Sequence, residues 1–518
     1  MAISRRYFLF GTMLAGVIPR AGFGSVPSLK FLGYQSPNEK MNIAGIGAGG
    51  RAMQVLGALE SENIVALADV DWARGADGFK RWEKAAKYRD FRQMLDKELK
   101  NIDAVTVVTP DHGHAVQALA AMQRGMHVYV EKPLTRTPWE ARLLADAAAR
   151  YKVATQMGNQ GYSHEATRVA AEIIWSGEIG DVTEVHSFRG RASWPEGMQT
   201  LPATERVPDT LDWDLWLGPA AFRPYTSGDE AYRKEHPNQF GFYLPFNWRG
   251  FYDFGSTLIG DWGIHQLGPA NLALRLGSPT SVECVTRGDG SSPYTFPRGG
   301  IVIKWEFAAR ENMPPVTVYW SHTGDMYTPQ GMTVEEMRAI PGTGPTIDTG
   351  PAEGRGRGLG GGREGRAGQA APGAPGQPGA QPTGAAGRGR GRGGQPGSGY
   401  NTVYVGTKGY LGTGGRGESV GLIPGSRWAE YKLPPRMLTR SPGHQRDWVR
   451  ACKGGEPACS NFSVAGPYTE WMVLGAVAAR VNGKLLWDPK KMEFTNSKEA
   501  NRYVKPMFRK GWEVKSIT

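Results

Sequence analysis

Residues 41–50 read MNIAGIGAGG and place a short apolar segment directly before a G-x-G-x-x-G turn. The glycines with this spacing are Gly45, Gly47 and Gly50. Residues 51–60 can continue as a helix, and residues 64–68 read as a second buried strand. In a chain with 72 glycines the motif alone is weak, but strand, glycine turn, helix and strand in this order are typical of a dinucleotide-binding unit. An ordinary glycine turn is the alternative.

An acidic residue follows the second predicted strand. Asp69 comes 19 residues after Gly50, where a carboxylate that binds the adenosine ribose is expected. It would accept hydrogen bonds from the ribose hydroxyls and repel a 2′-phosphate, which favours NAD over NADP. Asp71 is an alternative for this role, and Arg51, next to the glycine turn, is a further cofactor-binding candidate.

The alternation of strands and helices continues. Residues 102–108 and 127–130 read as strands, a helix is expected from about 114 to 124, and Thr137 opens another helix with a capping box. Such alternation predicts a doubly wound parallel sheet that binds ligands at the carboxyl ends of its strands. The cofactor-binding candidates at these ends are Thr109, Pro110, His112, Glu131, Lys132 and Asn159.

The length of 518 residues predicts one to three domains. We expect a dinucleotide-binding domain over residues 40–160 and a substrate and oligomerisation domain over residues 161–518. Strand-like segments at 301–307 and 316–319 and a helix at 467–481 belong to the second domain.

The first 35 residues predict a targeting segment. Arg5 and Arg6 precede an apolar run of 12 residues, as in a twin-arginine export signal, so we expect a periplasmic protein. The signal is either cleaved or kept as an anchor, and a short amphipathic helix is the alternative. No apolar run reaches the roughly 18 residues of a membrane span.

The net charge of +12 is concentrated outside the predicted domains. Residues 1–30 carry +4, and residues 353–399, with 19 Gly and seven Arg, carry +5. The rest carries only +3, so no nucleic-acid partner is expected. The insert at 353–399 is too poor in apolar residues to fold and is expected to be a disordered spacer. Attraction to an acidic polysaccharide or a membrane is the alternative.

The cysteines and histidines do not predict a metal site. His112 and His114 alone make a weak zinc pair, and no cysteine is near them in the sequence. Cys452 and Cys459 either pair in an oxidising compartment or stay free thiols, and Cys284 has no predicted partner.

Several short motifs, in this order, resemble the Gfo/Idh/MocA oxidoreductases. The glycine turn is followed by TPDHGH at 109–114, EKP at 131–133 and GDWGIH at 260–265. The resemblance implies a Rossmann domain and an α/β domain with an open, mostly antiparallel sheet. It also implies tightly held NAD(H) or NADP(H), a sugar or cyclitol substrate, and homo-oligomers packed through that sheet.

The resemblance also assigns candidate catalytic residues. Lys132 of the EKP motif would act as a base or as a cation that holds the substrate oxygen. Asp261 and His265 are four residues apart, so a helix would place both on one face. An imidazole titrates near ~6.5, which suits proton transfer. We therefore expect His265 as acid/base, Lys132 as polariser or relay, and Asp261 as substrate ligand, with a core histidine satisfied by Asp261 as the alternative.

The segment 194–254 is rich in aromatic residues, with 14 among 61. Aromatic faces suit stacking on sugars, and packing in the core is equally expected. Asn247, Trp248 and Arg249 are expected to line a polar pocket wall, and His444 is a weaker site candidate.

These residues allow three functions. The first is an NAD-dependent dehydrogenase of sugars or cyclitols. The second is a glycoside-cleaving enzyme that oxidises the ring transiently, eliminates, adds water and reduces again. The third, a sugar-binding protein without catalysis, is disfavoured because Lys132, Asp261 and His265 are all present.

Overall fold

The chain divides into two units, residues 1–39 and 40–518, and the fold described here belongs to the second. The computed structural model describes residues 39–235, 241–289, 292–324, 327–328, 330–333, 345, 347 and 400–514. The predicted export segment and the predicted insert at 353–399 lie outside these residues.

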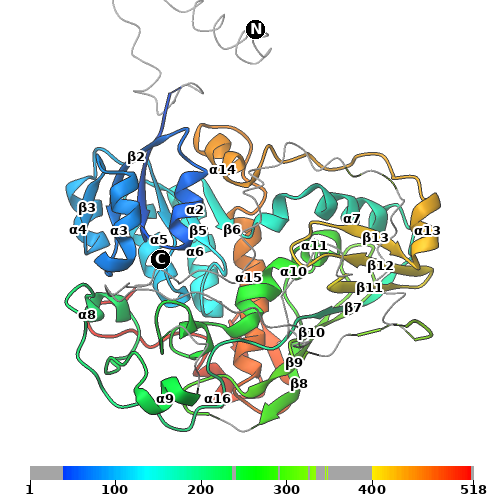
Figure 1. The fold of residues 1–518 in the computed structure, drawn as a ribbon. Helices are drawn as coiled ribbons and strands as arrows, with labels where there is room; N and C mark the ends of the chain where they lie inside the picture. Colours follow the sequence, from blue (N-terminus) through cyan, green and yellow to red (C-terminus); the bar gives the residue numbers. More distant parts are fainter. Residues whose placement is uncertain are drawn as a thin grey trace, which may run out of the picture. The chain divides into compact units, whose positions relative to one another are not determined.

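The first sheet has six parallel strands in the order β3-β2-β1-β4-β5-β6, with helices on both sides (Figure 1). Its strands are β1 (Asn42–Ile46), β2 (Asn63–Ala68), β3 (Ala86–Tyr88), β4 (Ala104–Val107), β5 (His127–Glu131) and β6 (Thr155–Gly158). Its helices are α2 (Arg51–Gly57), α3 (Trp72–Arg81), α4 (Phe91–Lys97), α5 (Asp111–Met122) and α6 (Pro138–Tyr151). The strand order reverses between β1 and β4, and ligands of such sheets bind at this point.

This sheet confirms the predicted doubly wound fold. The capping box of α6 is present, since Thr137 Oγ1 accepts from the Glu140 N–H and the Glu140 carboxylate accepts from the Thr137 N–H. Helix α5 starts at Asp111, three residues before the predicted start, because Pro110 stands in an extended conformation and serves as its N-cap.

The glycine turn after β1 needs glycine for a steric reason. Gly47 has φ +95°, and a Cβ there would lie 2.3 Å from the carbonyl oxygen of Val108. Gly50 is the N-cap of α2 and has φ +54°. The turn therefore brings the backbone of β1 against the end of β4, which forms the edge where a dinucleotide is expected.

The second sheet has nine strands in the order β13-β12-β11-β7-β10-β9-β8-β14-β15. All neighbours pair antiparallel except β7 and β10, which are parallel. The strands are β7 (Val182–Phe188), β8 (Ser281–Asp289), β9 (Arg298–Phe307), β10 (Val316–Ser321), β11 (Thr402–Gly406), β12 (Gly409–Thr413), β13 (Val420–Ile423), β14 (Leu485–Asp488) and β15 (Glu493–Phe494). The open, mostly antiparallel sheet implied by the resemblance is confirmed.

The remaining helices surround this sheet or connect it to the first. They are η2 (Gln160–Ser163), α7 (Glu165–Trp175), α8 (Trp213–Leu217), α9 (Glu230–Glu235), η3 (Asn247–Gly250), η4 (Ile259–Gly263), α10 (Ile264–Gln266), α11 (Gly268–Ala273), α13 (Gly425–Glu430), α14 (His444–Cys452), α15 (Phe462–Ala478) and α16 (Lys498–Asn501). Helix α15 starts five residues before the predicted Pro467, because Asn461 caps it by accepting from the Ser463 N–H.

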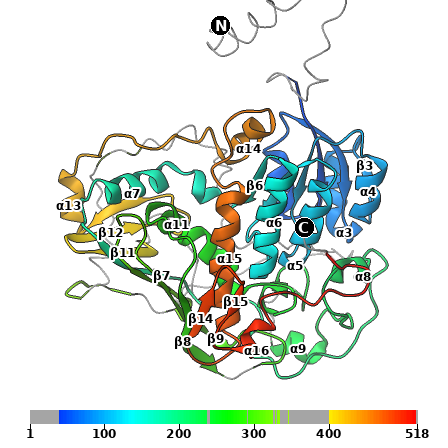
Figure 2. The same ribbon diagram turned by 180° about the vertical axis from the view of Figure 1, so that it is seen from behind.

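Helix α15 packs against both halves of the fold (Figure 2). A Cβ on Gly466 would lie 2.7 Å from Ala145 of α6, and one on Gly475 would lie 2.5 Å from the Trp305 ring of β9. Helix α14 also joins the first sheet, because its Trp448 is buried beside Tyr129 of β5. The C-terminal region therefore contributes to the first domain, which the boundary predicted at residue 160 did not include.

The three cysteines are free in the described structure. Cys452 is buried at the end of α14, whereas Cys459 Sγ lies 3.0 Å from Ser163 Oγ. Of the two alternatives for Cys452 and Cys459, the structure has the free thiols. None of the helices in the described ranges is long and apolar enough to cross a membrane.

The glycine turn yields a stability prediction. Gly47→Ala should lower the free energy of unfolding more than Gly177→Ala, because both glycines have positive φ (95° and 77°) but nothing lies within 4 Å of a Cβ on Gly177. The control should cost about 1–2 kcal/mol, the price of a left-handed backbone for an L-residue. Urea unfolding of both variants measures this, and equal losses would show that contact with Val108 does not constrain the turn.

Candidate active site

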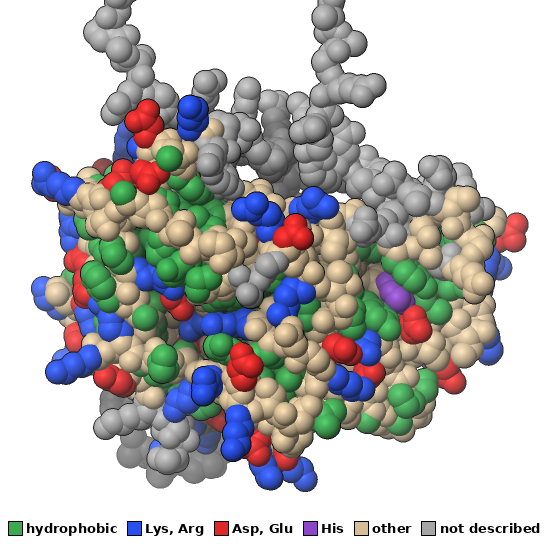
Figure 3. Space-filling model, turned by 90° about the horizontal axis from the view of Figure 1, so that it is seen from below, with side chains coloured by type: hydrophobic (Ala, Val, Ile, Leu, Met, Phe, Trp, Pro, Cys, Tyr) green, Lys and Arg blue, Asp and Glu red, His purple; other side chains and the backbone are tan. Residues whose placement is uncertain are grey.

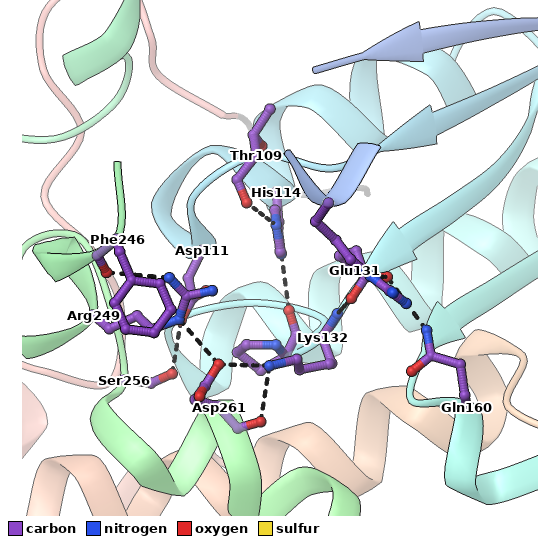
Figure 4. Close-up of polar contacts among 12 residues, drawn as sticks. Thr109, Asp111, His114, Glu131, Lys132, Gln160, Phe246, Arg249, Ser256 and Asp261 are labelled. Atoms are coloured by element: carbon purple, nitrogen blue, oxygen red, sulfur yellow. Dashed lines mark hydrogen bonds and ion pairs between the residues drawn. The ribbon is translucent and has the colours of Figure 1, made fainter. Parts of the chain in front are cut away.

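Side chains from both halves of the fold meet beyond the carboxyl end of β5 (Figure 4). Glu131 is the last residue of β5, and Lys132 follows it directly. Asp261 and His265 come from the consecutive helices η4 and α10, and Arg249 comes from η3. The structure thus brings together the three predicted catalytic residues and one of the three predicted for the pocket wall.

Lys132, Asp261 and Arg249 form a buried charge cluster. Lys132 Nζ lies 2.5 Å from Asp261 Oδ1 and donates to the Asp261 carbonyl oxygen at 2.9 Å. Arg249 Nε donates to the same Oδ1 at 3.0 Å. Burial raises the pKa of Asp261, but the charges of Lys132 and Arg249 outweigh it and hold the pKa well below its usual value. Asp261 is therefore an anion that fixes two cations.

The local backbone at Asp261 differs from the prediction. The sequence predicted Asp261 and His265 on one face of a helix, with Asp261 as a substrate ligand. The structure has a π-helix at Ile259–Gly263, a form that often marks functional sites, and the Asp261 carboxylate points to Lys132 and Arg249. Asp261 Oδ1 is occupied by these cations, so a contact with substrate is left to Oδ2.

His265 is buried beside this cluster. Its Nδ1 has no hydrogen-bond partner among the described residues, which argues against a core histidine satisfied by Asp261. Burial and the neighbouring charge of Lys132 lower the pKa of His265 well below its usual value. At neutral pH the imidazole is therefore uncharged.

The predicted ribose-binding acid is firmly held. Asp69 Oδ2 accepts from the Ala48 N–H at 2.8 Å, and Oδ1 accepts from the Asp71 N–H at 3.0 Å. Asp71 instead caps α3 by accepting from the N–H groups of Ala73 and Arg74. The geometry favours Asp69 over Asp71 for the ribose, because the Asp69 carboxylate lies against the glycine turn.

The residues at the end of β5 and β6 fit a nicotinamide nucleotide. Both Oδ1 and Nδ2 of Asn159 are buried without a hydrogen-bond partner among the described residues. An amide with both ends unsatisfied is expected to bind a ligand with a donor and an acceptor, such as a carboxamide. Arg51 Nε donates to Glu131 Oε1 at 2.9 Å, and Gln160 Nε2 reaches the same oxygen at 3.4 Å.

His114 ties two strand ends together. Its Nε2 lies 2.8 Å from the Thr109 carbonyl oxygen, and its Nδ1 lies 2.8 Å from the Pro133 carbonyl oxygen. This histidine therefore fixes the loop after β4 to the loop that carries Lys132. Among the described residues no three His, Cys, Asp or Glu side chains come together in a way that would hold a metal ion.

Other predicted residues lie in the core. His112 packs against Trp216 and Phe254, and its Nε2 lies 2.9 Å from the Trp216 carbonyl oxygen. Burial lowers the pKa of His112 to about 4. Its contact with a nicotinamide stays a prediction. Asn247 Nδ2 donates to the Gly241 carbonyl oxygen at 2.9 Å, and its place in a pocket wall stays a prediction.

Most of the aromatic segment is also core. The buried members of this cluster are Leu211, Trp213, Trp216, Leu217, Ala220, Tyr232, Phe242, Tyr243, Trp248, Phe251 and Phe254. Trp248 is therefore a core residue. Its ring also contacts the site, because the Arg249 guanidinium carbon lies 4.3 Å from its centroid. His444 is buried too, with its ring nitrogens at Ser163 Oγ and the Met157 carbonyl oxygen.

Two site residues were missed. The Asp111 carboxylate accepts from Ser256 Oγ at 2.8 Å (Figure 4), and the Arg249 charge acts on it. Burial raises the pKa of Asp111. Its place in the TPDHGH motif was a usable signal, whereas nothing in the sequence around Ser256 points to a site.

The charge cluster predicts a pH-dependent stability difference. Asp261→Asn should lower the free energy of unfolding by about 3 kcal/mol near pH 7, because two buried cations lose their counter-ion. A carboxyl group whose folded-state pKa is lowered stabilises the fold above its unfolded pKa of about 3.9 and loses this effect as pH falls through the folded pKa.

The difference between wild type and Asp261→Asn should therefore be full above about pH 5 and shrink below about pH 4. Urea unfolding at several pH values measures it. Glu60→Gln is the control, because the Glu60–Arg81 pair is exposed and should contribute less than about 1 kcal/mol. A loss for Asp261→Asn as small as for the control would contradict the assignment.

Two family descriptions match the chain. Residues 40–159 match "Oxidoreductase family, NAD-binding Rossmann fold", and residues 172–289 match "Oxidoreductase family, C-terminal alpha/beta domain", both parts of Gfo/Idh/MocA.

Curated relatives match parts of the chain. Levoglucosan dehydrogenase of Pseudarthrobacter phenanthrenivorans is 31% identical over 133 residues, 26% of this chain and 32% of the relative. Inositol 2-dehydrogenase of Salmonella typhimurium is 27% identical over 183 residues, which are 34% of this chain and 54% of the relative. A glycosyl hydrolase family 109 protein of Solibacter usitatus is 30% identical over 201 residues, which are 35% of this chain and 44% of the relative. The chain thus spans from about a third to about half the length of these relatives.

Solved structures resemble the chain over most of its length. An inositol dehydrogenase homolog from Azotobacter vinelandii, complexed with NADH and myo-inositol, has a TM-score of 0.48 at 15% identity and covers 87% of this chain and 98% of its own. Levoglucosan dehydrogenase in complex with NADH has a TM-score of 0.49 at 16% identity, and the match covers 85% of this chain and 97% of that structure. With its two matched regions and its two sheets, the chain belongs to the NAD-binding Gfo/Idh/MocA family of oxidoreductases.

Proposed function

We propose that this oxidoreductase transfers a hydride between a tightly bound NAD and a hydroxyl-bearing carbon of a sugar, a sugar derivative or a cyclitol. The observation that carries the proposal is the Lys132 ammonium, held by Asp261 next to the end of β5, with the buried His265 imidazole beside this cluster. The printed names of the relatives, levoglucosan and inositol dehydrogenases, support this substrate class.

NAD, when bound, supplies the hydride acceptor or donor. Asp69 would hold the adenosine ribose, and the unsatisfied amide of Asn159 would hold the carboxamide of the nicotinamide. NAD lacks the 2′-phosphate of NADP, which the half-buried Asp69 carboxylate would repel.

The chain's own residues would handle the proton. An ammonium group has three donors, and Asp261 takes two from Lys132, so one is left for the substrate oxygen. His265 would accept the hydroxyl proton when the substrate is oxidised and return it in the reverse direction. Arg249 positions Asp261 from the other side and thereby keeps Lys132 in place.

Cleavage of glycosides is not favoured over dehydrogenation. Two of the three relatives compared above are dehydrogenases by their printed names, and no residue of the cluster is specific to elimination and hydration. A sugar-binding protein without catalysis is disfavoured because the Lys132, Asp261 and His265 side chains are assembled.

The catalytic assignment can be tested with one lysine variant. Lys132→Ala should lower turnover at least about 100-fold, the scale of a lost acid/base or polarising group, while the nucleotide stays bound. Sugars and cyclitols are added to the purified protein, absorbance of the reduced nicotinamide is followed, and bound nucleotide is released and quantified. Lys100→Ala, at an exposed position, is the control. Near-normal turnover in Lys132→Ala would remove this lysine from the site.

Export and assembly remain part of the proposal. We expect a twin-arginine export signal at residues 1–35, a periplasmic location and a homo-oligomer. Replacing Arg5 and Arg6 together by Lys should leave the protein in the cytoplasmic fraction of a Gram-negative host, because the twin-arginine route reads that pair. Cell fractionation and immunoblotting measure this. Unchanged periplasmic recovery would contradict the signal assignment.

A further inference from the structure

Two arginines lie over one tryptophan beside His265. The Arg189 guanidinium carbon is 3.4 Å from the Trp262 ring centroid, and that of Arg416 is 4.9 Å from it. The Trp262 ring is in edge contact with the His265 ring, with centroids 6.0 Å apart. The Trp262 ring therefore contacts both guanidinium groups and the predicted proton acceptor.

Both arginines are attached to well-fixed backbone. Arg189 directly follows β7, and its N–H donates to the Ser321 carbonyl oxygen at the end of β10. Arg416 lies in the loop between β12 and β13, and its carbonyl oxygen packs so closely on Gly161 that a Cβ there would be 1.9 Å away. The second sheet thus carries both arginines, and the backbone at Arg416 lies against η2, which follows β6.

Around Trp262 and Asp261, positively charged side chains outnumber negatively charged ones. Asp261 is already shared by Lys132 and Arg249. Besides Asp261, Glu418 is the one acid among the described residues that acts on Arg189, and its Oε2 accepts from the Arg416 backbone N–H. Within the described ranges the Arg189 side chain has no hydrogen bond or ion pair of its own, although burial, partly opposed by the Asp261 charge, lowers its pKa.

Exposure alone would not single out these residues. Lys and Arg side chains lie at many points of the face seen from below, with Asp and Glu side chains among them (Figure 3). Arg189 differs because its half-buried guanidinium stacks on an aromatic ring and forms no ion pair with an acid among the described residues. Stacking fixes the plane of a guanidinium and leaves its N–H edge free for two parallel hydrogen bonds to an anion.

We propose that the substrate of this site is an anionic sugar, whose carboxylate or phosphate ester binds Arg189 and Arg416 beside Trp262. This rests on the proposed dehydrogenase function and narrows its substrate class. Lys132 and His265 face the carbon that is oxidised, and the arginines hold the charged end of the same molecule. A neutral sugar leaves the Arg189 guanidinium without a partner.

The test compares matched sugars on the full chain with its bound nucleotide. Glucose, glucuronate and glucose 6-phosphate form one set, and galactose, galacturonate and galactose 6-phosphate form another. Dissociation constants are measured by calorimetry, and turnover is measured by absorbance of the reduced nicotinamide. An anionic sugar should bind at least about 10-fold more tightly than its neutral counterpart, the scale of one charge-assisted hydrogen bond. Comparing the carboxylate with the phosphate ester in each set shows which anionic group the site prefers.

Arginine variants locate the contact. Arg189→Gln and Arg416→Gln should each remove most of this preference, measured as the ratio of the dissociation constants of the neutral and the anionic sugar. Arg191→Gln is the matched control, because this exposed arginine lies two residues further on and donates to the Thr323 carbonyl oxygen. Circular dichroism checks that each variant folds.

The outcomes separate the two proposals. Turnover of neutral sugars with no preference for anionic ones overturns the anionic substrate and leaves the dehydrogenase standing. Tight anionic binding that depends on Arg189, without any nicotinamide reduction, supports the anion site and contradicts the dehydrogenase. A preference that survives in both arginine variants, or equal loss in Arg191→Gln, overturns the assignment to Arg189 and Arg416.

Discussion

The ion pair between Lys132 and Asp261 is the contact on which the proposed chemistry depends. Lys132 follows a strand of the first sheet, and Asp261 belongs to a helix that leads into the second half of the fold. Both side chains are largely buried, with 16% and 11% exposed. Removing charges from water is costly, so such a pair is maintained only with good geometry and further hydrogen bonds. Arg249 and the Asp261 carbonyl supply these.

This contact explains why one half of the fold is incomplete without the other. The first sheet provides the glycine turn, Asp69 and Lys132, and the remainder of the chain provides Asp261 and His265. His114 links the loop after β4 to the loop that carries Lys132, so the cofactor side and the proton-handling side are built on the same backbone. Helix α15, packed on α6 and on β9, holds the two sheets in one unit.

The sequence predicted the parts of this site that carry local patterns. The strands β1, β2, β4 and β5, the capping box at Thr137 and the positions of Lys132, Asp261 and His265 follow from short-range periodicity or from motifs. The short strand β3 and helix α4 were not predicted, because three and seven residues give little periodic signal. The packing of α14 on the first sheet, more than 280 residues away from β6 in the sequence, has no local signature.

Long-range contacts also fix the surroundings of residues that the sequence could not place. His112 and Trp248 stand in motifs that suggest a site, yet both are buried in an aromatic cluster that forms only when residues 211–254 fold back on α5. Arg189 and Arg416 were not predicted, because an isolated arginine has no pattern, and only the fold places both over Trp262.

A crystal structure of the full chain with NADH tests the central claim most directly. The account predicts a nicotinamide ring at the end of β5, with its reactive carbon facing the space between Lys132 and His265, so that a substrate carbon could lie about 3–3.5 Å from it. A nucleotide bound elsewhere, or a nicotinamide turned away from both side chains, would contradict it.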